Sequence, residues 1–243
     1  MQPLLVLWDV DYTLISAGGV GLRMYKAALR EMYGLELPRL PQSFAGRTDS
    51  AIALEVLDLV GVPDPVGQLP RFQAFLGRRA AAMADDVREH GSVLPGAAEA
   101  VAALAAGLNG QPVVQSLLTG NLPDLARMKL SALNLTEHLD LAIGAYGDIS
   151  ADRADLVEVA RARATARYGG DFGGRLTVLV GDTPDDVDAA LRNGASAVAV
   201  ASGSFSVAEL AAAGAHVVLP NLANTAAAVH AILGAPAAGR REG

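Results

Sequence analysis

The sequence contains no cysteine, which excludes disulfides and thiol chemistry and fits a reducing compartment. Lysine is almost absent too, occurring only at Lys26 and Lys129, and the formal net charge is -7. Broad nucleic-acid binding needs a basic face, so we expect no nucleic-acid partner. The N-terminal apolar run stops at Asp9, has no basic segment before it and is far shorter than the roughly 20 residues that span a bilayer. We therefore expect a cytoplasmic protein with no membrane partner.

Short apolar runs alternate with helical patterns along most of the chain. With 51% hydrophobic and 19% charged residues, the composition is that of a globular protein. Nearly all-apolar runs are typical of strands covered on both faces, and they predict strands at residues 4–8, 112–118, 139–143, 176–180, 195–200 and 216–219. The helical patterns between them predict an α/β fold, a Rossmann-like doubly wound parallel sheet.

One interval breaks this alternation. Between the first two predicted strands, the only patterns after residue 14 are helical, at residues 20–33, 48–59 and 66–88. Glycine-containing, hinge-like segments flank the block. We predict an all-helical cap domain at residues 17–91, inserted into a core domain made of residues 1–16 and 92–243.

Acidic residues gather where three of the predicted strands end. The segments concerned are Asp9-Val10-Asp11-Tyr12-Thr13, Thr119-Gly120-Asn121 and Gly181-Asp182-Thr183-Pro184-Asp185-Asp186. Ligands of open parallel sheets bind outside the carboxyl ends of the strands, so we expect these segments to converge. Converging carboxylates repel each other unless a cation lies among them, and oxygen-only ligands suit Mg²⁺. The pattern therefore predicts a magnesium site, with phosphate oxygens held near Thr119 at a helix N-terminus. Asp185, at the start of a predicted helix, is interpreted as a capping residue.

The order of these motifs resembles that of the haloacid dehalogenase (HAD) superfamily. The motifs are Asp-x-Asp-x-Thr, then Leu-Thr-Gly-Asn, then Gly-Asp-Thr-Pro-Asp-Asp, and the helical insert is similar to the superfamily's C1 cap. The resemblance covers about residues 4–233 and is closest to phosphoglycolate-phosphatase-like hydrolases. It implies a Mg²⁺-dependent phosphatase that hydrolyses a small phosphorylated metabolite through an aspartyl-phosphate intermediate.

The resemblance also implies roles for individual residues. Asp9 is expected to be the nucleophile, and Asp11 the general acid and then the general base. The phosphoryl group is expected to bind Thr119, Gly120 and Asn121. The magnesium site is expected to involve Asp9, Asp11 through its backbone carbonyl, Asp182, and Asp186 directly or through water.

The chain departs from the superfamily at the basic residue that neutralises the aspartate–phosphate pair. Related phosphatases often have Gly-Lys-Pro at this point, whereas this chain has no lysine between Gly144 and Arg153. We predict that Arg153 takes the role, because a guanidinium can bridge two oxyanions. Lys129 is the alternative, although its position in a predicted helix favours a solvated face. In the insert, Arg47 is expected to bind an anionic group of the substrate, and a surface arginine before a helix is the competing interpretation.

The carboxylate at Asp11 discriminates among related reactions. Dehalogenases and phosphonatases lack an acid at this position, so its presence argues against both. A phosphomutase resembling β-phosphoglucomutase would keep every core motif and stays an alternative. A non-catalytic phosphate-binding member of the family is a second alternative, because motifs alone do not measure turnover.

Overall fold

A parallel sheet forms the centre of the protein. The computed structural model describes residues 2–39, 41, 43–107 and 110–238. The five strands lie in the order β4-β1-β5-β6-β7 and comprise β1 (Leu4–Trp8), β4 (Val113–Leu117), β5 (Thr177–Gly181), β6 (Ser196–Val200) and β7 (Val217–Leu219). Successive side chains of a strand point to opposite faces. In β1, Leu4, Val6 and Trp8 accordingly join one hydrophobic cluster, while Leu5 and Leu7 join another.

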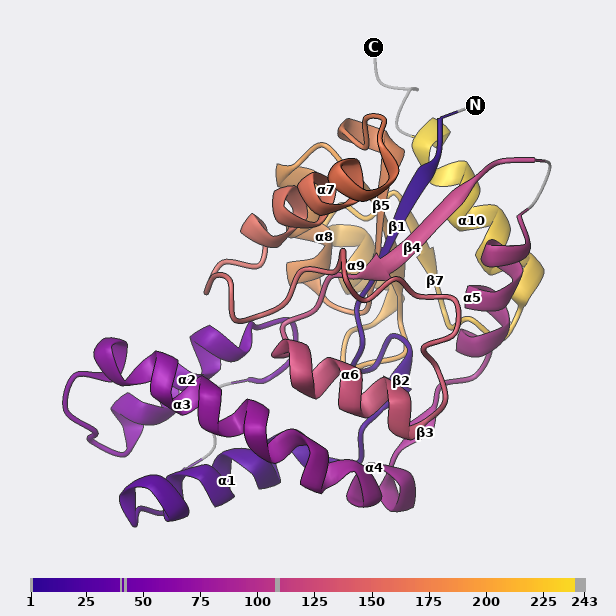
Figure 1. Ribbon diagram of the computed structural model, residues 1–243. Coiled ribbons are helices and arrows are strands. Elements are labelled where there is room, and N and C mark those ends of the chain that lie inside the picture. Colours follow the sequence, from indigo (N-terminus) through magenta and orange to yellow (C-terminus); the bar gives the residue numbers. More distant parts are fainter. Residues whose placement is uncertain (1, 40, 42, 108–109, 239–243) are drawn as a thin grey trace.

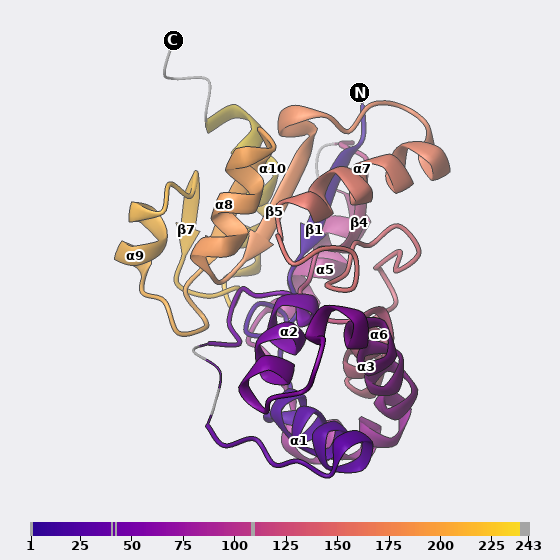
Figure 2. The same ribbon diagram turned by 90° about the vertical axis from the view of Figure 1, so that its left-hand side faces the viewer.

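Helices cover both faces of the sheet, as the apolar strand sequences predict (Figures 1 and 2). One face packs against α5 (Ala97–Ala106) and α10 (Thr225–Ala238). The other packs against α7 (Asp155–Tyr168) and α8 (Pro184–Arg192), and α9 (Val207–Ala212) follows β6. The chain runs from β1 to β4 on one side and then to β5 on the other, so the order reverses at β1. Such a switch point is where open α/β sheets bind their ligands.

Among the described residues between β1 and β4, the regular elements are helices and one short pair of strands. These are β2 (Ile15–Ser16) and β3 (Ser92–Val93), which pair antiparallel. Between them lie α1 (Val20–Tyr33), α2 (Asp49–Leu59), α3 (Pro65–Ala80) and α4 (Ala84–His90). A 3-10 turn at Ala81–Met83 divides α3 from α4, where the sequence pattern suggested one continuous helix. Within the described part of the chain, no helix is long and apolar enough to cross a membrane.

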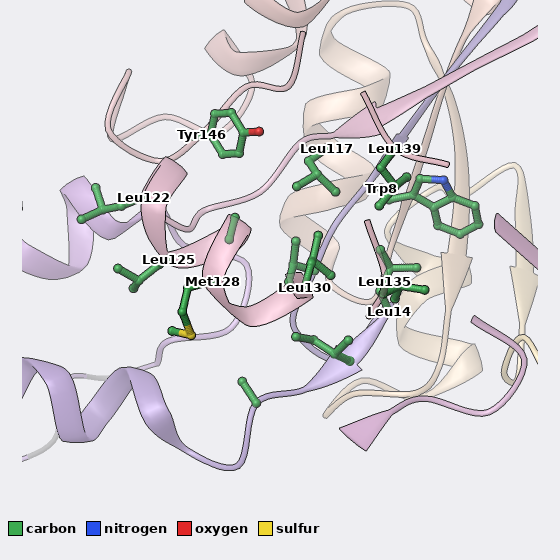
Figure 3. Packing of buried hydrophobic residues seen from close by; sticks show 14 of the residues in the cluster. Trp8, Leu14, Leu117, Leu122, Leu125, Met128, Leu130, Leu135, Leu139 and Tyr146 are labelled. Carbon is green, nitrogen blue, oxygen red and sulfur yellow. The ribbon is translucent and has the colours of Figure 1, made fainter. Parts of the chain in front are cut away.

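Helix α6 (Pro123–Ala132) joins the sheet to the inserted helices. It contacts α3 and α4, and Figure 2 shows it beside α3. Its side chains Leu125, Met128 and Leu130 belong to the cluster that also contains Trp8 (Figure 3). Cap residues such as Phe72 belong to the same cluster, so the apolar core continues from one face of the sheet into the insert.

The predicted strand at residues 139–143 is wrong. The segment is an irregular loop that contributes buried Leu139 and Ile143 without joining the sheet. Asp140 explains the difference: its backbone N–H donates to Gln115, its carbonyl accepts from Ser116, and its carboxylate accepts from the N–H of Ala142. This turn consumes the backbone groups that a strand ladder would need. An apolar run of this length does not separate a buried strand from a buried loop.

Candidate active site

The predicted motifs meet at the carboxyl end of β1. Asp9 and Asp11 follow β1, Thr119 lies just beyond β4, and Asp182 follows β5. These strands are neighbours, and the N–H of Asp9 donates to Val180 across the strand ends. The segments form one side of a cavity of about 290 Å³ whose other side is the inserted helices.

Arg153 lies between the carboxylates of Asp9 and Asp186. It lies just before α7, and its side chain is only 6% exposed. Its Nη2 atom is 2.7 Å from Oδ1 of Asp9 and 2.7 Å from Oδ1 of Asp186. The same guanidinium donates to the carbonyls of Leu118 and Gly46. One buried cation thus bridges two carboxylates, the geometry that favours arginine over lysine.

Three carboxylates form a compact buried cluster. One oxygen from each of Asp9, Asp182 and Asp186 lies within 4.8 Å of the other two. Burial raises the pKa of Asp9 to about 6, against the lowering effect of Arg153. Burial, followed by repulsion from Asp9 and Asp186, raises the pKa of Asp182 to about 8. In both shifts the effect of burial outweighs the lowering effect of the Arg153 guanidinium.

The donor set of this cluster fits a hard divalent cation. All its ligand atoms are carboxylate oxygens, the type that Mg²⁺ prefers. Asp186 is held by Thr183, whose N–H and hydroxyl both donate to Oδ2 and complete the cap of α8. The Nε atom of Arg153 is buried with no hydrogen-bond partner among the described residues, so the guanidinium can donate one more hydrogen bond.

Asp11 belongs to a second group beside this cluster. Its Oδ2 atom accepts from Lys129 Nζ at 2.6 Å and from Asn121 Nδ2 at 2.8 Å. Lys129 also donates to Oδ1 of Asn121 at 2.6 Å, and Asn121 Nδ2 lies 2.8 Å from the hydroxyl of Thr119. The Asp11 carboxylate therefore faces Lys129 and Asn121 rather than the three clustered carboxylates, and it remains 31% exposed.

Lys129 is not on a solvated helix face, so that interpretation is wrong. The residue is 4% exposed and points from α6 into the site. A signal was present in the sequence: residues four apart in a helix share a face, and Leu125 on the same face is buried. The burial of Lys129 also gives the site two cations, Arg153 on Asp9 and Lys129 on Asp11.

The start of α2 is docked on the core loops. The N–H of Asp49 donates to the carbonyl of Gly120 at 2.6 Å, and that of Ser50 donates to Gly147 at 3.0 Å. In return, the N–H of Leu122 donates to Oδ2 of Asp49 at 2.7 Å. Thr48 makes the N-terminal cap of α2, and Asp49 connects α2 to the core.

Arg47 lines the cavity but is held within the insert. It forms an ion pair with Glu55 of α2, and it donates to the carbonyls of Ser43 and Ala51. Asp185, predicted to cap a helix, is exposed in the first turn of α8, where Thr183 is the capping residue.

Comparisons with known proteins extend this description. A family model described as HAD-hydrolase-like matches residues 155–225, a span that includes Asp182 and Asp186. No curated protein matches the sequence.

Solved structures share the fold over nearly the whole chain. A hydrolase from Pseudomonas syringae is 21% identical, with 93% of this chain and 97% of that chain covered and a TM-score of 0.63. A predicted phosphoglycolate phosphatase from Haemophilus somnus is 16% identical, with 93% and 98% covered and a TM-score of 0.63. A predicted phosphatase from Clostridium acetobutylicum is 17% identical, with 90% and 94% covered and a TM-score of 0.59. At these identities the likeness establishes the fold.

The family match and this shared fold agree with the order of the motifs in the sequence. Both are similar to haloacid dehalogenase-like hydrolases, the superfamily that the motif order resembles.

Proposed function

We propose that the protein is a Mg²⁺-dependent phosphatase acting on a small phosphorylated metabolite, with residues 17–91 as its cap. One observation supports the proposal most directly. The buried Asp9 carboxylate forms an ion pair with Arg153 and lies close to two further carboxylates. All of them lie at the point where the strand order of the sheet reverses. A carboxylate is useful as a nucleophile toward a phosphate dianion only where positive charge offsets the repulsion between them.

In this proposal Asp9 attacks the phosphorus atom while the ester P–O bond breaks. Asp11 donates a proton to the departing alkoxide, and the product is an aspartyl phosphate on Asp9. A water molecule then attacks that phosphorus, Asp11 accepts its proton, and inorganic phosphate leaves. Lys129 and Asn121 hold the Asp11 carboxylate for both transfers.

The remaining residues bind phosphate and metal. Thr119, Gly120 and Asn121 line the cavity beside Asp9 and are proposed to hold the phosphoryl oxygens. Asp9, Asp182 and Asp186, with the backbone carbonyl of Asp11, are proposed to hold Mg²⁺. When bound, Mg²⁺ would supply positive charge to the phosphoryl group during transfer. Arg153 is proposed to keep Asp9 ionised and aligned and to neutralise the adjacent phosphate.

The test is phosphate release from p-nitrophenyl phosphate with Mg²⁺ and with EDTA. We expect turnover that requires Mg²⁺, and acid quenching during turnover should leave phosphate on the peptide that contains Asp9. Turnover that survives EDTA would contradict the metal requirement. Transfer of phosphate to a sugar instead of water would favour the mutase alternative, and binding without turnover would favour the non-catalytic one.

A further inference from the structure

The cavity has two chemically different ends. The end formed by the strand termini carries the groups proposed for phosphate and metal. The end formed by the insert is walled mainly by apolar side chains, among them Val20, Leu22, Phe44 and Ile52. If Asp9 attacks phosphorus at the first end, the alcohol part of the substrate lies at the second. The walls of this second end therefore select the alcohol.

Every cation among the described residues that line the cavity has an anionic partner. Arg153 pairs with Asp9 and Asp186, and Lys129 pairs with Asp11. The third, Arg47, pairs with Glu55. Two of the three therefore serve the phosphate end, and Arg47 is the one at the insert end.

The partners of Arg47 hold it in a structural role. Its Nη1 atom donates to Glu55 and to the carbonyl of Ser43, and its Nη2 atom donates to the carbonyl of Ala51. The side chains of Arg47 and Glu55 are only 26% and 24% exposed, so water screens the pair weakly. Separating it to bind a substrate anion would leave the Glu55 carboxylate without its cation in a half-buried position.

Two other polar side chains at the insert end, those of Tyr25 and Asp49, bind each other. The Tyr25 hydroxyl donates to Oδ1 of Asp49 at 2.9 Å, and Oδ2 of Asp49 accepts from the N–H of Leu122. Asp49 would repel a substrate carboxylate. Among the described lining residues, the insert end thus offers an anion no cation that lacks a partner.

We infer that the substrate alcohol is an uncharged, largely apolar group, an inference that rests on the proposed phosphatase function. A carboxylate in this position would lose hydration without gaining a cation that lacks an anionic partner. The sequence predicted that Arg47 binds an anionic group of the substrate. In the structure its guanidinium is instead paired with Glu55.

Two phosphate monoesters of the same shape test the inference. In phosphoglycolate the two carboxylate oxygens take the places of the two methyl groups of isobutyl phosphate. Each is measured as a competitor of p-nitrophenyl phosphate hydrolysis and, where it turns over, by kcat/KM. We expect isobutyl phosphate to be preferred by about tenfold or more, as a hydrophobic pocket discriminates against an unpaired polar group. Equal or better use of phosphoglycolate overturns the inference but leaves the phosphatase proposal standing.

A variant supplies the converse test. Glu55→Gln removes the anionic partner of Arg47, so it should shift the preference toward phosphoglycolate by about tenfold. The matched control is Glu36→Gln, which breaks the exposed ion pair with Arg30 elsewhere in the insert and should leave the preference unchanged. An unchanged preference in folded Glu55→Gln would overturn the assignment of Arg47. Absence of p-nitrophenyl phosphate hydrolysis in the unaltered protein would instead reject the proposed function, and this inference with it.

Discussion

The Lys129 ammonium lies 2.6 Å from the carboxylate of Asp11, a residue outside the cluster of three carboxylates. The contact orients Asp11 toward the cavity and places a full positive charge beside it. If Asp11 donates the proton to the leaving alcohol, Lys129 is a positioning residue for that transfer, and its importance depends on how much the leaving group needs the proton.

We expect Lys129→Met to lower kcat for an alkyl phosphate by about 100-fold, the lower range for general acid–base catalysis. The loss with p-nitrophenyl phosphate should be much smaller, because p-nitrophenolate leaves without protonation. Steady-state kinetics on both substrates measures the difference. Arg127→Met is the control, since Arg127 is exposed on the same helix. Equal losses on both substrates would show that Lys129 supports the fold rather than Asp11.

Asp9→Asn should reduce turnover by about 1000-fold or more, because the amide cannot act as the nucleophile. Circular dichroism should be unchanged, since asparagine has nearly the same shape. Asp188→Asn, an exposed change on α8, should retain full activity. Substantial turnover by folded Asp9→Asn would remove the aspartyl-phosphate mechanism.

Arg153→Met should cost about 3–5 kcal/mol in the free energy of unfolding near neutral pH, since it leaves buried carboxylates without their cation. The cost should shrink at low pH, where Asp9 takes up a proton. Urea denaturation at two pH values measures it. Arg192→Met is the control: its ion pair with Asp152 is exposed on both sides, and no measurable change is expected. A cost that does not depend on pH would argue that Arg153 acts through packing alone.

The metal-free protein should lose stability as the pH rises. The pKa of Asp182 moves from an ordinary value of 3.8 to about 8 on folding, so between these values the folded state holds a proton that the unfolded state has lost. The contribution of Asp182 is therefore fully present below pH 3.8 and gone above about pH 8.

Asp182→Asn removes this titration. Without metal, the variant should melt at a higher temperature than the unaltered protein at about pH 9, with a smaller difference at about pH 5. Added Mg²⁺ should raise the melting temperature of the unaltered protein at the higher pH and have little effect on the variant. A lower melting temperature for Asp182→Asn than for the unaltered protein, without metal at the higher pH, would contradict the expected destabilisation by the ionised Asp182 carboxylate.

Gly120→Ala should displace the insert from the core. A Cβ atom at this position would lie 2.0 Å from the carbonyl oxygen of Arg47, which is too close for the present docking of α2. We expect a lower kcat/KM, because an insert docked over the cavity excludes water from it. We also expect faster cleavage by protease in the segments that flank the insert. Gly234→Ala is the control, as its added methyl group meets nothing within 4 Å. Normal kinetics in Gly120→Ala would mean that the close approach of Gly120 to the Arg47 carbonyl does not hold the insert in place.

Motif order predicted the meeting place of Asp9, Asp11, Thr119 and Asp182, because parallel strands bring their carboxyl ends to one edge. The partners of these residues were harder to predict. The spacing from Leu125 places Lys129 on an apolar face of α6, but the packing of α6 against α3 and α4, which buries that face, is not encoded in a local pattern. The ion pair between Arg47 and Glu55 likewise depends on how the loop before α2 folds back. The irregular path of residues 139–143 depends on the hydrogen bonds of Asp140.

The pairing of β2 with β3 has a consequence for how such a protein can be modified. Ile15 lies opposite Val93 and Ser16 opposite Ser92, so the chain departs for the helical insert and comes back through adjacent strands. Neighbouring strands are only about 4.8 Å apart. For the sheet, the whole insert therefore behaves as one long hairpin loop, and its length places no demand on the register of β1. A helical module whose ends lie one strand spacing apart, and whose surface matches α6 and the core loops, can therefore be joined at this junction without a change in the register of β1.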